Sequence, residues 1–124
     1  MRNRAAVGRW IHDKANRSST SIAIIAAGEK WPDGSLRPSI EDLWGAGGVI
    51  ASLHALGWTD LSPEARMAMA TFRSVTGRIV EELRDCASGR ELFEIGLGQD
   101  VDDAATVDES PHVPILDGER FVRA

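Results

Sequence analysis

An uninterrupted apolar run, Ile-Ala-Ile-Ile-Ala-Ala over residues 22–27, is the most distinctive feature of the hydrophobic pattern. Turn-forming residues follow it at Gly28 and again at Pro32-Asp33-Gly34. A short apolar run that does not alternate with polar residues is typical of a strand buried on both faces, as in a parallel sheet. We therefore expect a buried strand over residues 21–26, followed by a polar loop over residues 28–38.

Apolar residues at helical spacing dominate the remainder of the sequence. They predict helices over residues 3–17, 40–56, 63–86, 89–95 and 100–107, with Gly77 as a candidate kink in the third. Near the C-terminus, residues 112–116 and 121–122 are expected to form a hairpin about Asp117-Gly118, because this dipeptide is typical of tight turns.

Serine residues are placed as N-caps before three of these helices, at Ser39, Ser62 and Ser88. Pro63 supports the second cap, because proline favours the first helical position. Asp42 lies three residues after Ser39, so this pair resembles a capping box.

Glycines interrupt the helix predicted over residues 40–56. Gly45, Gly47 and Gly48 each cost about 1 kcal/mol relative to alanine. We expect a compensating contact, either close backbone packing against the sheet or a ligand near the first turns. Gly57 is the expected stop of this helix.

The predicted strand lacks neighbours, since the other strand candidates form only the C-terminal hairpin. The expected fold class is α/β: a helix–strand–helix unit with further helices and a small C-terminal hairpin. Residues 1–124 are interpreted as a single domain, which resembles the C-terminal part of a larger three-layer α/β domain. Because proteins avoid exposed sheet edges, we do not expect a well-behaved monomer.

Composition narrows the class of function. The net charge of −5 argues against a nucleic-acid partner, because such proteins carry a basic surface. The single cysteine, Cys86, excludes an internal disulfide and suits a reducing compartment. The sequence contains neither an apolar signal core near Met1 nor a run long enough to span a bilayer. These features predict a soluble cytoplasmic protein with no membrane partner.

Candidate chemistry gathers after the predicted strand, where open α/β sheets bind ligands. Glu29 follows the strand and Asp42 lies in the first turn of the next helix. Both are candidate catalytic residues and Mg²⁺ ligands, because Mg²⁺ takes one or two carboxylates together with phosphate oxygens and water. Asp42 has an equally plausible role as a helix cap. Glu41 is either a further ligand or a solvent-facing residue.

Three more residues are candidate anion or substrate ligands. Arg37 has a guanidinium that suits phosphate or sulfonate, although it is as easily a surface arginine. Ser35 either donates to an anion or closes the turn. Ser39 lies at a helix N-terminus, where free N–H groups and the helix dipole favour anions. The acidic run over residues 100–103 is expected to be a solvated helix start. No metal-ligand spacing relates His12, His54 and His112.

The same residues carry a family resemblance. Gly28-Glu29, residues 33–38, residues 41–43 and residues 45–47 occur in the order found in the C-terminal half of 2-phosphosulfolactate phosphatases. Further similar pieces follow the same order, at residues 2–7, 61–66, 87–92, 100–101 and 113–116.

This resemblance implies an α/β, Mg²⁺-dependent phosphatase that hydrolyses (2R)-2-phospho-3-sulfolactate to sulfolactate and phosphate, a step of coenzyme M biosynthesis. The family's N-terminal segments Arg-x-Thr-Ser, Asn-Ser-Pro and Thr-Thr-Asn-Gly are not found in the sequence. The expected partners are therefore a small anionic phosphoester and either further copies of this chain or a complementary N-terminal half. The alternative is a catalytically inactive remnant that binds a partner through its unpaired sheet edge.

Overall fold

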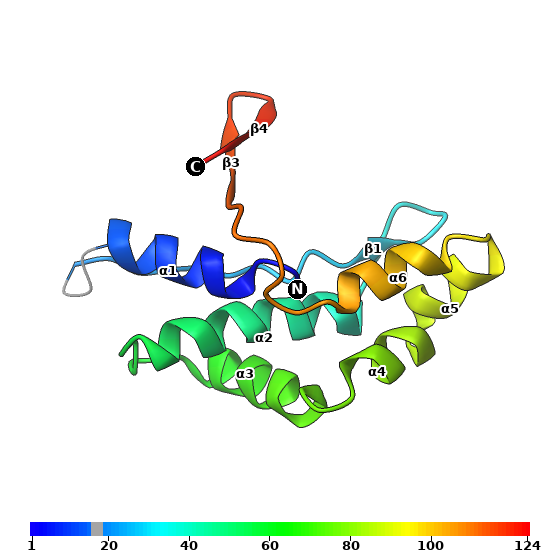
Figure 1. Ribbon diagram of the computed structural model, residues 1–124, viewed down its shortest axis with the longest axis horizontal. Coiled ribbons are helices and arrows are strands. Elements are labelled where there is room, and N and C mark those ends of the chain that lie inside the picture. The colour runs from blue at the N-terminus through cyan, green and yellow to red at the C-terminus, as the bar shows by residue number, and fades with distance from the viewer. Residues whose placement is uncertain (16–18) are drawn as a thin grey trace.

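Six helices and two small antiparallel strand pairs form the part of the chain that the structure describes, residues 1–15 and 19–124 of a computed structural model (Figure 1). This composition confirms the α/β class. The helices are α1 Arg4–Lys14, α2 Ile40–Ala55, α3 Pro63–Val75, α4 Ile79–Asp85, α5 Ala87–Glu94 and α6 Gly98–Ala105. The strands are β1 Glu29–Lys30, β2 Leu36–Arg37, β3 Pro114–Asp117 and β4 Arg120–Arg123.

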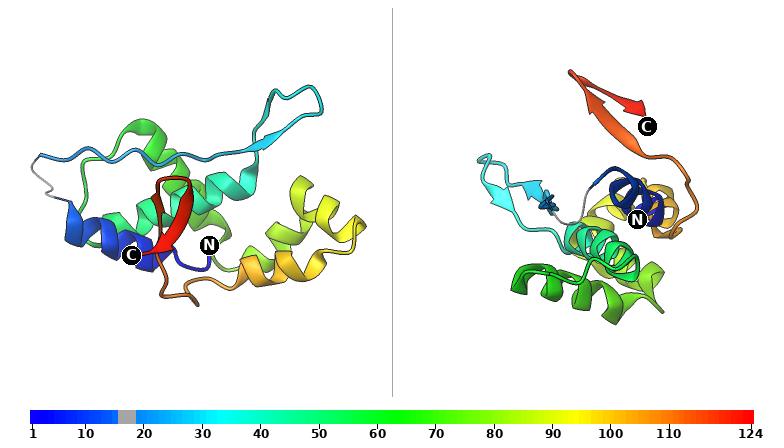
Figure 2. Two further views of the ribbon diagram at one scale, coloured as in Figure 1. Left: turned by 90° about the horizontal axis from the view of Figure 1, so that it is seen from above. Right: turned by 90° about the vertical axis from the view of Figure 1, so that its left-hand side faces the viewer.

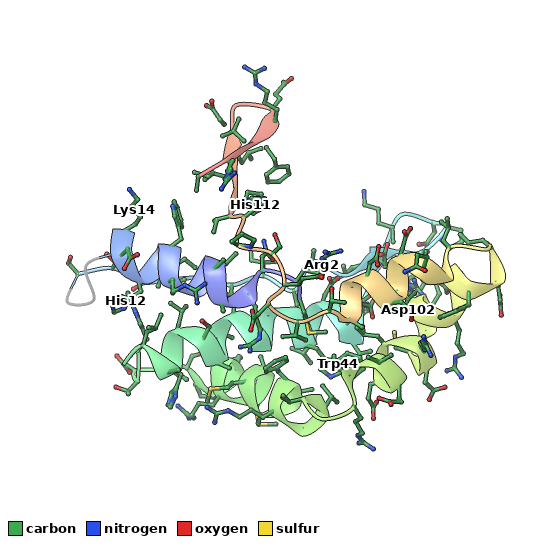
Figure 3. All side chains as sticks on the ribbon, in the orientation of Figure 1. Arg2, His12, Lys14, Trp44, Asp102 and His112 are labelled. Carbon is green, nitrogen blue, oxygen red and sulfur yellow. The ribbon has the colours of Figure 1, made fainter. Side chains whose placement is uncertain are left out.

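Helix α2 lies at the centre of the molecule, between α1 and α3 (Figures 1 and 2). Trp44 of α2, labelled in Figure 3, is 5% exposed and belongs to the same apolar cluster as Phe72 of α3. The same apolar cluster continues into α4 and α6, through Val75, Ile79, Leu83, Val101 and Ala105. A smaller cluster of Ile50, Ala68 and Met69 holds the other part of the α2–α3 contact.

Gly47 and Gly48 allow the close approach of α2 to the neighbouring helices, whereas a Cβ at Gly45 would meet nothing within 4 Å. A Cβ atom added at Gly47 would overlap the carbonyl oxygen of Ala68 in α3 and lie 2.9 Å from the Cβ of Phe72. A Cβ at Gly48 would lie 2.9 Å from the Cδ of Arg4 in α1. The expected close packing is therefore present, but its partners are helices and not a sheet.

The structure of residues 21–26 differs from the buried strand that the sequence predicts there. The segment is extended and runs along α2, but it is not paired with another strand (Figure 2). Ile24 packs against the cluster around Ile50, while Ile25 is 83% exposed. A strand needs neighbours for its backbone groups, and the described residues supply none beside this segment. The prediction of a buried strand is therefore wrong for this structure, although the extended conformation of the segment agrees with the sequence pattern.

Two other element predictions need correction. The loop over residues 28–38 contains a short hairpin, in which Glu29 pairs with Arg37 and Lys30 with Leu36. The helix over residues 63–86 is two helices, α3 and α4, because the backbone leaves the helical region at Arg78, which has φ −146°. After this break, Ile79 and Leu83 pack in the apolar cluster that also contains Val101 and Ala105 of α6.

The remaining helices and the C-terminal hairpin are confirmed. Helix α2 begins at the predicted residue, α5 and α6 begin two residues early, and Gly57 ends α2 with φ +93°. The last residues of the helix predicted over 3–17 lie outside the described residues. In the hairpin, Gly118 has φ +61° at the first turn position, which is typical of a type II′ turn. The hairpin projects away from the helices (Figure 1).

The segment that follows α6 crosses the start of α1. Asp108 accepts a hydrogen bond from the Ala5 N–H at 2.8 Å and pairs with Arg4 at 2.7 Å. Ser110 N–H donates to the Arg2 carbonyl at 2.8 Å, and Arg2 pairs with Glu109 at 2.7 Å. Figure 3 shows Arg2 beside this segment, which we call the closing segment, residues 106–112.

Of the three predicted serine caps, only Ser62 caps its helix through its side chain. Its Oγ accepts from the Ala65 N–H at 3.2 Å. Ser39 occupies the N-cap position of α2 without a side-chain cap bond, and Cys86 caps α5 in place of Ser88, with its Sγ 3.4 Å from the Gly89 nitrogen.

We expect Ser62→Ala to lower the free energy of unfolding by about 1 kcal/mol, the usual cost of losing an N-cap. Urea unfolding followed by tryptophan fluorescence measures the change. Ser88→Ala is the matched control, because that hydroxyl caps no helix and its loss should leave the midpoint unchanged. Equal losses in the two variants would contradict the assignment of the caps.

In the described chain, no helix is both long and apolar enough to cross a membrane.

Candidate functional site

A cavity of about 510 Å³ gathers carboxylates from three elements. Glu29 comes from β1, Glu41 and Asp42 from the first turn of α2, and Asp100 from the first turn of α6. Apolar residues form much of the remaining wall, including Ile24, Ile25, Val49, Leu83, Leu92 and Val101. The structure thus brings the predicted pair Glu29 and Asp42 to one cavity, which we call the acidic cavity.

Asp42 connects α2 to the start of the β1–β2 hairpin. Its Oδ2 accepts a hydrogen bond from the Gly28 N–H at 2.7 Å, so the carboxylate does not cap its own helix. Gly28 has φ +72°, a conformation that favours glycine, and a Cβ there would lie 2.8 Å from the Arg37 carbonyl oxygen. Asp42 therefore fixes the residue immediately before Glu29. One oxygen suffices for this bond, and a carboxylate accepts several.

Glu29 is exposed, and its side chain makes no ion pair or hydrogen bond within residues 1–15 and 19–124. It lies opposite Arg37 in the hairpin register. Its carboxylate oxygens are therefore available to a cation or to solvent.

Arg37 forms a two-pronged ion pair with Glu91 of α5, at 2.7 and 2.9 Å. The hydrogen bonds to Glu91 raise the pKa of Arg37, and the charges of Glu91, Glu29 and Glu41 act in the same direction. The guanidinium also lies over the Trp31 ring, 5.4 Å from its centre. Arg37 thus joins the hairpin to α5, and an anion would have to replace Glu91 to bind it.

The two serines proposed as anion ligands are engaged locally. Ser35 donates from both its hydroxyl and its N–H to Asp33 Oδ1, at 2.6 and 2.9 Å, and these bonds lower the pKa of Asp33. Ser35 therefore closes the turn. Ser39 Oγ lies 3.4 Å from the Arg37 carbonyl oxygen. Neither serine, nor Arg37, lines the acidic cavity.

Two residues of the acidic cavity were not predicted as site residues: Ser88 was interpreted as a helix cap and Asp100 as part of a solvated helix start. Asp100 and Ser88 belong to α6 and α5, far along the chain from Glu29. Glu41 was recognisable only by its position next to Asp42. Its Oε2 lies 3.8 Å from the Sγ of Cys86, which also lines the cavity.

The described residues include no group of three or more His, Cys, Asp or Glu side chains that could hold a metal ion. Mg²⁺ does not require such a group, because it often uses one or two carboxylates and completes its shell with water and substrate phosphate. Glu29 and Asp42 supply oxygen ligands of the kind Mg²⁺ prefers. The donor set therefore fits this binding mode of Mg²⁺, without a fully protein-built centre.

A second cavity of about 710 Å³ lies between residues 20–26 and the helices α2 and α3. Its wall is mainly apolar, with Thr59, Asp60 and Glu64 among its polar residues. None of the predicted site residues lines it.

Cys86 provides a probe of the acidic cavity. Burial raises the pKa of its thiol, and the nearby Glu41 carboxylate adds to this increase. Because the thiolate is the reactive form, iodoacetamide at pH 8 should modify Cys86 several-fold more slowly in the folded chain than in urea.

Glu41→Gln should increase the rate of modification in the folded chain, since it removes the negative charge beside the thiol. Mass spectrometry follows the reaction, and the rates of parent and variant in urea serve as the control. Unchanged rates in the folded variant would mean that Glu41 does not face the thiol in solution.

The fold and this cavity define an α/β protein with an acidic site beside the end of an extended segment. The comparisons with known proteins give the family. A family model described as 2-phosphosulpholactate phosphatase matches residues 1–119, and the chain belongs to this family. A protein of Deinococcus radiodurans described as "Probable 2-phosphosulfolactate phosphatase" is 37% identical over 99 residues, which are 80% of this chain. The chain spans 39% of the length of that relative.

Proposed function

We propose that this chain provides the carboxylate side of a Mg²⁺-dependent phosphatase site that acts on 2-phospho-3-sulfolactate and releases sulfolactate and phosphate. The observation that carries the proposal is the meeting of Glu29 and Asp42 at one cavity, in a chain of this family. By the same resemblance we propose a role in coenzyme M biosynthesis and a location in the cytoplasm.

Glu29 and Asp42 are the proposed Mg²⁺ ligands. When bound, Mg²⁺ polarises phosphoryl oxygens and activates water. Asp42 keeps its position through the Gly28 N–H, and this contact also fixes the backbone next to Glu29. Glu41 and Asp100 add negative charge to the cavity wall. This charge favours the binding of a cation and repels an anion that is not accompanied by a cation.

Arg37 is the proposed ligand of the substrate's phosphate or sulfonate. The Glu91 side chain that it pairs with is 59% exposed. The Arg37 side chain is 14% exposed and is held by two hydrogen bonds, so a substrate anion must offer two acceptor oxygens to replace Glu91. Ser35 and the α2 start at Ser39 lie in the same hairpin region and remain proposed secondary contacts.

The test is phosphate release from 2-phospho-3-sulfolactate, with and without Mg²⁺. The chain is assayed alone and after co-expression with the part of the Deinococcus relative that lies outside the match. We expect Mg²⁺-dependent release in the co-expressed sample, and weaker release from an analogue without the sulfonate. A stable complex that releases no phosphate, or release that chelation leaves unchanged, would overturn the proposal.

A further inference from the structure

Residues 21–27 form an extended segment whose two edges are both open; we call it the edge segment. In the described chain, no hydrogen bond holds a backbone group of these residues. The next residue along the chain, Gly28, has a hydrogen-bonded amide, which donates to Asp42. Natural sheets protect such edges with charges, prolines or bulges. The edge segment contains neither a charge nor a proline.

The edge segment borders both cavities. Ile22, Ile24 and Ala26 line the 710 Å³ cavity above α2 and α3, and Ile24 and Ile25 line the acidic cavity. The segment is therefore an extended, largely apolar stretch with unpaired backbone groups and open space next to it. These are the requirements for the addition of a strand from another polypeptide.

We propose that the edge segment is the docking site for strands of a complementary polypeptide, which corresponds to the part of the Deinococcus relative outside the match. About three fifths of that relative's length has no counterpart in the matched region. A polypeptide of this size can supply a strand to each edge. The inference concerns binding and does not depend on phosphatase activity.

A second copy of the chain fits the edge segment less well. A closed pair of identical chains uses the same surface on each copy. Pairing of the two edge segments would therefore cover one edge of each and leave the other edge open. The exposed Ala23 and Ile25 side chains would also still need a cover.

The test begins with co-expression of the full chain and the unmatched part of the relative, with an affinity tag on the latter. We expect a one-to-one complex by light scattering. Amide hydrogen exchange should show residues 21–27 exchanging rapidly in the chain alone and strongly protected in the complex.

Two proline variants then probe the two edges. Ala23→Pro and Ala26→Pro each remove one N–H, and residues an odd number apart in a strand direct their N–H groups to opposite edges. These amides have no partner within residues 1–15 and 19–124, so the melting temperature of the chain alone should not change. We expect each variant to weaken the complex at least tenfold, while Ala23→Ser and Ala26→Ser, which keep the N–H, bind as the parent does.

Several results would overturn the inference. They are the absence of a complex with the parent chain, full binding by both proline variants, and protection of residues 21–27 by self-association at rising concentration of the chain alone. The last result would assign the edge to a second copy. A protected complex without phosphate release contradicts only the proposed function, and phosphate release without protection contradicts only this inference.

Discussion

Glu29→Gln is expected to lower kcat about 10²–10³-fold in the complex that hydrolyses 2-phospho-3-sulfolactate. Glutamine keeps the shape of the side chain and removes the charge of a proposed Mg²⁺ ligand. Loss of a single contact that stabilises transition-state charge commonly has an effect of this size. Steady-state phosphate release over a range of Mg²⁺ concentrations gives the result, and isothermal titration should show weaker Mg²⁺ binding in the same variant.

Glu41→Gln is the matched control, since Glu41 lines the same cavity but is not a proposed ligand. We expect it to reduce kcat by less than tenfold, well below the effect at Glu29. If Glu29→Gln keeps nearly full activity and Mg²⁺ dependence while Asp42→Asn abolishes both, the metal is bound mainly by Asp42. The assignment of Glu29, which follows from its place after the extended segment, then fails.

Gly47→Ala is expected to lower the free energy of unfolding by about 1–3 kcal/mol, the usual cost of overpacking a core. The new methyl group would overlap the Ala68 carbonyl oxygen, which belongs to the backbone of α3 and cannot rotate away as a side chain can. The two central helices would have to separate. The gain in helix propensity, about 1 kcal/mol, offsets only part of this cost.

Gly45→Ala on the same helix provides the control, because a Cβ there meets nothing within 4 Å. This variant should gain up to about 1 kcal/mol through helix propensity alone. Urea unfolding of both variants separates the two effects. If Gly47→Ala were as stable as Gly45→Ala, the α2–α3 contact in solution would be wider than the structure shows.

The sequence pattern predicts helices well here because one apolar stripe is enough to specify each of them. Helix α2 begins at Ile40 as expected, and Ser62 with Pro63 starts α3. The prediction of a strand over residues 21–26 was wrong because the local pattern does not contain all that a strand needs. Its apolar run indicates a preference for burial, but burial of a strand also needs hydrogen-bonding neighbours, which no local pattern contains.

The proximity of Glu29 and Asp42 in the candidate site was predictable because the two residues are close in the sequence. Glu29 and Asp42 reach one cavity because a short hairpin separates the extended segment from α2. Their hydrogen-bond partners were not predictable from spacing. Asp42 had a cap position available and instead binds Gly28, and Arg37 meets Glu91 from a helix much later in the chain.

The closing segment, residues 106–112, makes contacts that we expect to form late in folding. Its contacts join residues more than a hundred positions apart, such as Arg2 with Glu109 and Ala5 with Asp108. Long-range contacts of this kind bear the full entropy of loop closure, whereas α2 and α3 are neighbours in sequence. We therefore expect the α2–α3 pair to form early. The start of α1 should be fixed last, when Asp108 binds Arg4 and holds its guanidinium over the Phe72 ring.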